Sequence, residues 1–190
     1  GAGRDPSTRA IRSQVFDGNG AVLGGGPDFV VNQTTAGDQI EASVAALSSG
    51  GFVVSWTDGA LATNASNVRA RVFDADGNPV TGEFEVNTTT TGNQHDSAVA
   101  ALDDGRIVIS WVDTNPGGGD TSGSSIRAQV FNVDGTKSGT EFLVNTITNS
   151  HQLAPAIDVL ADGRFTITWT DNSFVLGAVS AQDIRGQIFD

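Results

Sequence analysis

The stretches GFVVSWTD (Gly51–Asp58), RIVISWVD (Arg106–Asp113) and RFTITWTD (Arg164–Asp171) are copies of one pattern. In each copy, apolar residues at alternate positions lead to a Trp, and an Asp follows the Trp two residues later. This alternation has the period of a β-strand with one face more deeply buried than the other. The stretches therefore predict equivalent strands in a protein built from repeats.

Further segments recur around the Trp strand, in a fixed order. They are IRSQVFD (11–17), VRARVFD (68–74), IRAQVFN (126–132) and IRGQIFD (184–190); FVVN, FEVN and FLVN, ending at Asn32, Asn87 and Asn145; and SVAAL, AVAAL and AIDVL, ending at Leu47, Leu102 and Leu160 and preceded by Gln39, Gln94 and Gln152. Glycine-rich turn signals such as SSGG, DDG and DADGN separate the segments. We therefore expect short strands joined by tight turns and essentially no helix.

The segments define a unit of four strands in the order a (ending at Leu47), b (ending at Asp58), c and d. The chain then reads as a half-unit over 11–40 (strands c and d), units over 41–92 and 93–150, and a unit over 151–190 (strands a, b and c). Such meanders predict an all-β fold of repeated four-stranded antiparallel sheets resembling β-propeller blades. A flat stack of sheets and a β-sandwich are the alternatives. Because fewer than four blades do not close a propeller, we expect open ends, or ends completed by oligomerisation.

Composition limits the partners. The 190 residues carry a formal net charge of −12 and no Cys. An acidic surface repels nucleic acid and anionic membranes, and no apolar run is long enough to insert into a bilayer. We therefore expect a soluble protein that binds no nucleic acid. The chain begins Gly-Ala-Gly without a Met, so we also expect a processed product or a piece of a longer array.

GGFVVSWTD, IRAQVFNVDG and SAVAALDDGR, with DADGNPVTGEFEVNTTTTGNQ, resemble repeats of very large secreted bacterial proteins that often also carry calcium-binding nonapeptide (RTX-type) modules. Those proteins are usually regarded as adhesins. The resemblance covers nearly the whole chain from about Ile11. It implies a bacterial, extracellular or cell-surface setting and supplies no catalytic residue.

The turns after strand c are candidate calcium sites. They carry a D-x-D-G-like pattern, whose oxygen-bearing residues are Asp17, Asn19, Asp74, Asp76, Asn132 and Asp134. Carboxylate and amide oxygens at this spacing can ligate Ca²⁺, which takes six to eight oxygens. The same pattern also forms a hairpin turn, in which the Asp caps its own backbone. Calcium binding is thus one of two interpretations of these turns.

The Trp residues and the Asp that follows each of them have alternative interpretations. Trp56, Trp111 and Trp169 could stack on sugar rings of surface glycans, as in a propeller lectin, or belong to the core. The repeated Asp, which is Asp58 in the first copy, favours a structural link with the Arg of strand c, which is Arg69. No catalytic set stands out, so we expect no enzyme, with a propeller hydrolase as the least favoured alternative.

The third b–c connection breaks the repeat. It reads NSFVLGAVSAQD and places Phe174, Val175, Leu176 and Val179 where the other copies have polar loops. Exposed apolar clusters commonly mark interfaces. Strand c also occurs at both ends of the chain, so we add its apolar residues to the predicted interface: Ile11, Val15, Ile184 and Ile188. The sequence thus predicts a structural, adhesive module that self-associates head-to-tail, as a ring or a filament.

Overall fold

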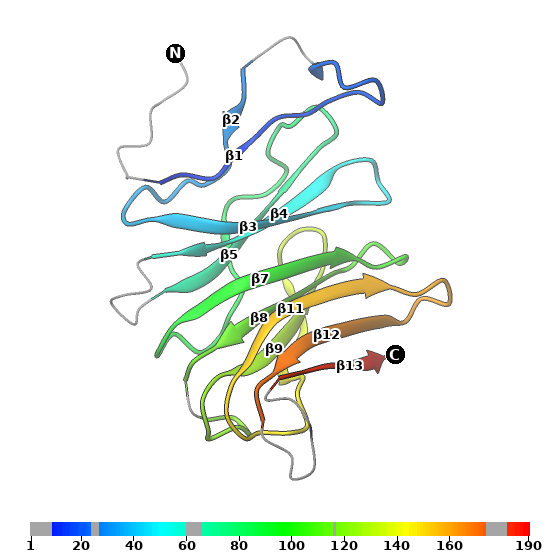
Figure 1. Ribbon diagram of the computed structural model, residues 1–190. Helices are drawn as coiled ribbons and strands as arrows, with labels where there is room; N and C mark the ends of the chain where they lie inside the picture. The colour runs from blue at the N-terminus through cyan, green and yellow to red at the C-terminus, as the bar shows by residue number, and fades with distance from the viewer. Residues whose placement is uncertain (1–8, 24–26, 60–65, 116, 174–181) are drawn as a thin grey trace.

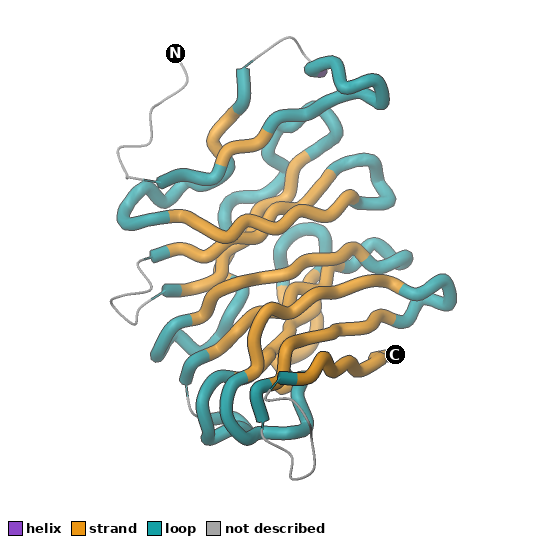
Figure 2. The backbone as a smooth tube through the Cα atoms, viewed as in Figure 1, coloured by secondary structure: helices purple, strands orange, loops and turns teal. Residues whose placement is uncertain are grey.

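The computed structural model describes residues 9–23, 27–59, 66–115, 117–173 and 182–190. These residues form antiparallel strands and no α-helix (Figures 1 and 2). The strands are β1 (Arg12–Ser13), β2 (Phe29–Val30), β3 (Gln39–Ala46), β4 (Phe52–Asp58), β5 (Asn67–Phe73), β6 (Phe84–Glu85), β7 (Gln94–Ala101), β8 (Ile107–Asp113), β9 (Ser125–Phe131), β10 (Lys137–Leu143), β11 (Gln152–Val159), β12 (Phe165–Asp171) and β13 (Asp183–Phe189).

The strands form successive sheets along the chain. A two-stranded β1–β2 half-unit comes first, then the sheets β3-β4-β5-β6 (unit one), β7-β8-β9-β10 (unit two) and β11-β12-β13 (unit three). Each sheet is an antiparallel meander in chain order, and the sheets lie one after another through the molecule (Figure 1). The expected all-β, blade-like architecture is confirmed. Strand β3 begins at Gln39, slightly before the boundary expected at residue 41.

The hydrophobic core lies between the sheets. Because successive side chains of a strand point to opposite faces, each inner sheet packs against both neighbours. One cluster joins the half-unit to unit one and contains Val31 and Trp56. A second joins units one and two around Trp111, and a third joins units two and three around Trp169. The repeated Trp strand is therefore the centre of each inter-sheet layer.

Aromatic pairs join adjacent sheets. Phe84 of β6 packs on Phe131 of β9 with ring centroids 5.3 Å apart, and the corresponding pairs of the other sheets are separated by similar distances. A turn glycine, Gly135, lies directly on the Phe84 ring, at a φ of +83°. Only glycine fits there, since an added Cβ would come within 2.8 Å of the ring.

Candidate functional site: polar triads and the two end units

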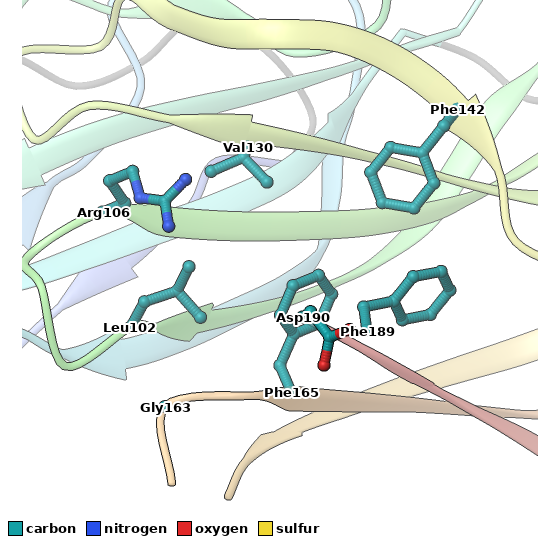
Figure 3. Close-up of a pocket in the computed structure, with 8 residues that line it drawn as sticks. All are labelled: Leu102, Arg106, Val130, Phe142, Gly163, Phe165, Phe189 and Asp190. Carbon is teal, nitrogen blue, oxygen red and sulfur yellow. The ribbon is translucent and has the colours of Figure 1, made fainter.

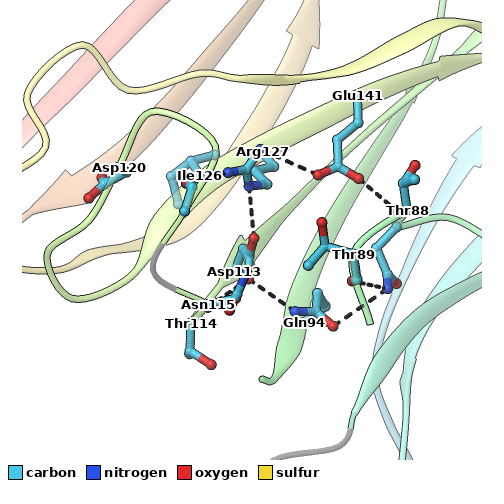
Figure 4. Close-up of polar contacts among 12 residues, drawn as sticks. Thr88, Thr89, Gln94, Asp113, Thr114, Asn115, Asp120, Ile126, Arg127 and Glu141 are labelled. Carbon is cyan, nitrogen blue, oxygen red and sulfur yellow. Dashed lines mark hydrogen bonds and ion pairs between the residues drawn. The ribbon is translucent and has the colours of Figure 1, made fainter. Parts of the chain in front are cut away.

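A polar triad crosses unit two (Figure 4). Arg127 of β9 donates from Nε to Asp113 Oδ2 of β8 at 2.7 Å, and its Nη1 lies 3.4 Å from Glu141 Oε1 of β10. All three side chains are at least about nine-tenths buried. Gln94 of β7 donates from Nε2 to Asp113 Oδ1 at 3.0 Å, so all four strands of the sheet contribute to one network. Such a network is stable in the interior only because its charges are paired and hydrogen-bonded.

Unit one repeats this triad with Asp58, Arg69 and Glu83. Arg69 Nε donates to Asp58 Oδ2 at 2.6 Å, and its Nη1 lies 3.2 Å from Glu83 Oε1. The predicted structural link between Asp and Arg is therefore confirmed. Glu83 also accepts hydrogen bonds from the Thr34 hydroxyl and from the backbone N–H of Gln33, and so joins unit one to the preceding half-unit. Burial alone would raise the pKa of Glu83, but these hydrogen bonds and the Arg69 charge outweigh it and lower the pKa.

Each end unit holds two of the three members of a triad. In unit three, Arg185 of β13 pairs with buried Asp171 of β12 and lies 3.9 Å from Asp183, and the described sheet has no strand d to add a second acid. In the half-unit, Arg12 of β1 pairs with Asp28, which stands where Glu83 stands in unit one. The described half-unit has no strand b to supply the other acid. Unit three thus holds the acid of strand b, the half-unit holds the acid of strand d, and each has its own Arg.

In the part of the chain that the structure describes, the outward face of unit three is exposed. Val68 of β5 and Ile126 of β9 are fully buried at 0% exposure, whereas the equivalent Ile184 of β13 is 76% exposed. The cause is positional, since β7 packs over unit one and β11 packs over unit two. No described strand covers unit three in the same way. Ile188 is likewise exposed, so the two β13 residues of the predicted interface do lie on an open surface.

The N-terminal side is only half covered. Ile11 is buried against unit one and Val15 is partly buried, so in a single chain neither is an open interface residue. By contrast, Phe16 is 55% exposed and Val44 of β3 is 65% exposed, although Val99, the counterpart of Val44 in unit two, is buried. The half-unit therefore leaves part of the near face of unit one open. The predicted interface residues Phe174, Val175, Leu176 and Val179 lie outside the described residues.

The prediction that the Trp residues form sugar platforms is corrected. Trp56, Trp111 and Trp169 are buried in the inter-sheet clusters, and no ring face is open to a ligand. The reason is that the Trp lies on the strand face that packs against the preceding sheet. Among the described residues, each indole Nε1 is buried without a hydrogen-bond partner.

The turn acids cap their own turns. Asp74 Oδ1 accepts from the backbone N–H of Asp76 and of Asn78, and Asp17 does the same in the half-unit. In unit two, Asp134 accepts from Thr136, whose hydroxyl also accepts from the amide of Asn132. Among the described residues, no group of His, Cys, Asp and Glu side chains has the geometry of a metal site. Calcium binding through Asp17, Asn19, Asp74, Asp76, Asn132 and Asp134 stays a prediction; thermal stabilisation by millimolar Ca²⁺ that is lost in Asp74→Asn would support it.

An acid pair that the sequence did not predict lies on the first strands of units one and two. Each first strand has a bulge, and Glu41, Asp96 and Ala154 occupy equivalent positions with φ between 51° and 57°. Glu41 Oε2 accepts from the N–H of Asp96 at 3.0 Å and from the Thr57 hydroxyl at 2.8 Å. Burial, followed by the Glu41 charge, raises the pKa of Asp96. Only the repeat alignment of these bulges could have indicated the pair.

A small apolar pocket opens beside β13 (Figure 3). It measures about 240 Å³ and is lined by Leu102, Val130, Phe142, Phe165 and Phe189, with Arg106 and Asp190 at its rim. The position of the pocket explains why it is open. In unit two, the turn after β9 places Gly135 on Phe84, whereas no described turn follows β13 to cover Phe142. No described helix has the length and hydropathy of a membrane span.

Comparison with known proteins shows the fold and no family. No family model and no curated protein matches the chain. Among solved structures, a protein of unknown function from Dyadobacter fermentans superposes with a TM-score of 0.57 at 21% identity, over 84% of this chain and 40% of its own. An endo-arabinase from Bacteroides thetaiotaomicron gives 0.52 at 15% identity, over 82% and 57%. An α-L-arabinanase from Penicillium chrysogenum gives 0.51 at 13% identity, over 87% and 46%.

These similarities place the chain in a structural class. The two arabinan-cleaving enzymes are β-propellers, so the sheets described above are propeller-like blades. The chain spans roughly half the length of these neighbours, between 40% and 57%. At such low identity the likeness concerns the fold alone. The class is therefore a propeller-like β-repeat.

Proposed function

We propose that this chain is a bacterial extracellular structural and adhesive module that associates head-to-tail with copies of itself. The observation that carries the proposal is the contrast along strand c: Val68 and Ile126 are buried by the next sheet, and Ile184 is 76% exposed. This position of strand c is apolar and is buried wherever a further sheet packs over it. Its exposure in unit three therefore indicates a surface on which one more sheet can pack. The extracellular setting is supported by the repeat resemblance and the acidic composition.

The opposite end offers a matching surface. Val44 and Phe16 are exposed where their counterparts in the inner units are buried. A contact between unlike ends is heterologous, so it closes into a ring or continues as a filament, depending on its rotation. Light scattering across a concentration series, with electron microscopy of negatively stained samples, tests the proposal. Concentration-dependent rings or filaments are expected; a monomer at every concentration up to the millimolar range contradicts it.

A second candidate, glycoside hydrolysis, has one observation in its favour. Glu41 and Asp96 are neighbouring acids, and the raised pKa of Asp96 is what a general acid needs. Against it, Glu41 is already bonded to Thr57 and to the backbone of Asp96. Activity on arabinan that disappears in Asp96→Asn would favour hydrolysis. Absence of reducing-sugar release from arabinan by the wild type would remove this candidate.

A further inference from the structure

The two ends of the chain each carry a copy of strand c, β1 and β13. A head-to-tail contact between two molecules has room for one of these two strands. The structure indicates which copy is held more weakly. β1 pairs with β2 at two positions, Arg12 with Val30 and Ser13 with Phe29, and Val31 N–H donates to the Ile11 carbonyl at 2.9 Å. β13 pairs with β12 at every position from Asp183 to Phe189. Displacing β13 would break a full ladder, whereas displacing β1 would break a short one.

We propose that, on association, β13 of one copy takes the place of β1 in the next copy and pairs with its β2. The refinement rests on the proposed head-to-tail function and names the strands that carry it. Asp28 of the second copy then reaches Arg185, which already pairs with Asp171, and a third complete triad forms across the contact. β1 of the second copy is released.

The register follows from the inner units. In unit one, Arg69 lies opposite Glu85 and Ala70 opposite Phe84. The half-unit keeps this register, since Ser13 lies opposite Phe29. Gly186 occupies the same position in β13 as Ala70 in β5, so it faces Phe29 of the second copy.

The end cap of the strand is also conserved between units. Val68 N–H donates to Asn87 Oδ1 at 2.8 Å and Ile126 N–H donates to Asn145 Oδ1 at 2.8 Å. In the half-unit, Ile11 N–H donates to Asn32 in the same way. After exchange, Ile184 N–H replaces Ile11 N–H at Asn32, so the hydrogen bonds of β2 are substituted one for one.

Burial supplies the net gain. β2 loses a two-residue partner and acquires an equivalent one, while surfaces that were open in both copies become covered. On the first copy these are Ile184 and Ile188, with the threonines of β12 between them and β11. On the second copy the surface is that of Val44 on β3. This layer repeats the chemistry of the cluster that joins units one and two, where Val68 and Val72 meet Val99.

Two matched substitutions test the exchange by sedimentation equilibrium. Ile184→Asp puts a charge on a surface that is exposed in the single chain, so the variant folds, and association weakens about tenfold or more. Ile11→Asp puts the same charge under β1, the strand that is released, so association is unchanged or strengthened. Equal weakening by both substitutions overturns strand exchange, because both copies of strand c would then be needed in place.

A cross-link tests the register independently. The chain has no Cys, so Val31→Cys with Ile184→Cys introduces a single pair. The proposed pairing places these residues directly opposite one another in adjacent strands, within reach of a disulfide. Covalent oligomers are expected on oxidation, and none from the control pair Val31→Cys with Ile188→Cys, four residues away along β13.

The outcomes separate the two proposals. A wild type that never associates contradicts head-to-tail assembly itself. A wild type that associates, but forms the control cross-link in place of the predicted one, or forms neither, overturns the exchange and leaves assembly by another contact. The substitution pair remains decisive if the cysteine variants do not fold.

Discussion

Replacing Arg127 with Ala removes the centre of the buried triad in unit two. Asp113 would then remain almost completely buried without its ion-pair partner, and among the described residues it would keep the hydrogen bonds from Gln94 and from the Asn115 N–H. Breaking a buried pair on one side costs about 3–5 kcal/mol in free energy of unfolding. With a urea m-value of about 2 kcal/mol/M, the unfolding midpoint should fall by about 2 M. Urea titration followed by Trp fluorescence measures it.

The repeat supplies matched controls for this prediction. Arg12→Ala removes the same residue type from the same strand position, but both members of its pair with Asp28 are exposed, so the midpoint should not move measurably. Asp113→Asn should destabilise the wild type and partly rescue Arg127→Ala, because it removes the unpaired charge. Equal midpoints for the Arg127 and Arg12 variants, or no change of sign for Asp113→Asn, would refute the reasoning.

Three further predictions concern packing and pH. Gly135→Ala and Gly20→Ala both place a Cβ on a residue with a φ of +83°, but the Cβ meets the Phe84 ring at Gly135 and nothing at Gly20. Gly135→Ala should therefore lower the free energy of unfolding by about 1–3 kcal/mol more than Gly20→Ala does. Equal losses in calorimetry would argue against the contact. Ile109→Ala leaves a cavity in a fully buried layer and should cost about 3 kcal/mol in denaturant unfolding, and a cost below about 1 kcal/mol would show that the layer collapses to fill it. The lowered pKa of Glu83 contributes stability that is present above the ordinary carboxyl pKa and is lost as the pH falls through the pKa of the folded state. Glu83→Gln should therefore flatten the acid limb of a profile of stability against pH. An unchanged acid limb would contradict this prediction.

Much of the fold was predictable because the repeat can be recognised in the amino-acid sequence. Alternation around Trp56, Trp111 and Trp169 identified strand b, and the Asp–Arg link was expected from its recurrence in every unit. Alternation of side chains is a local property of a strand, and repetition averages out the ambiguity of any single segment. The predicted order of strands was therefore correct along the whole described chain.

The site was less predictable. The Trp residues were considered as sugar platforms because a single sequence does not show which of two apolar faces a neighbouring sheet covers. The Glu41–Asp96 pair was not predicted because it depends on a bulge that turns an acid of one strand toward the backbone of another. Such contacts join residues far apart in the chain and leave no local signal.

The sequence by itself determined the strands, their order and the duplication of strand c, because these follow from short-range patterning. Only the tertiary structure decided what the ends expose. Ile126 and Ile184 occupy equivalent positions in nearly identical segments, yet one is fully buried and the other is open. Burial is set by the neighbouring sheet and not by the residue, so the same sequence pattern forms core at Ile126 and an exposed surface at Ile184.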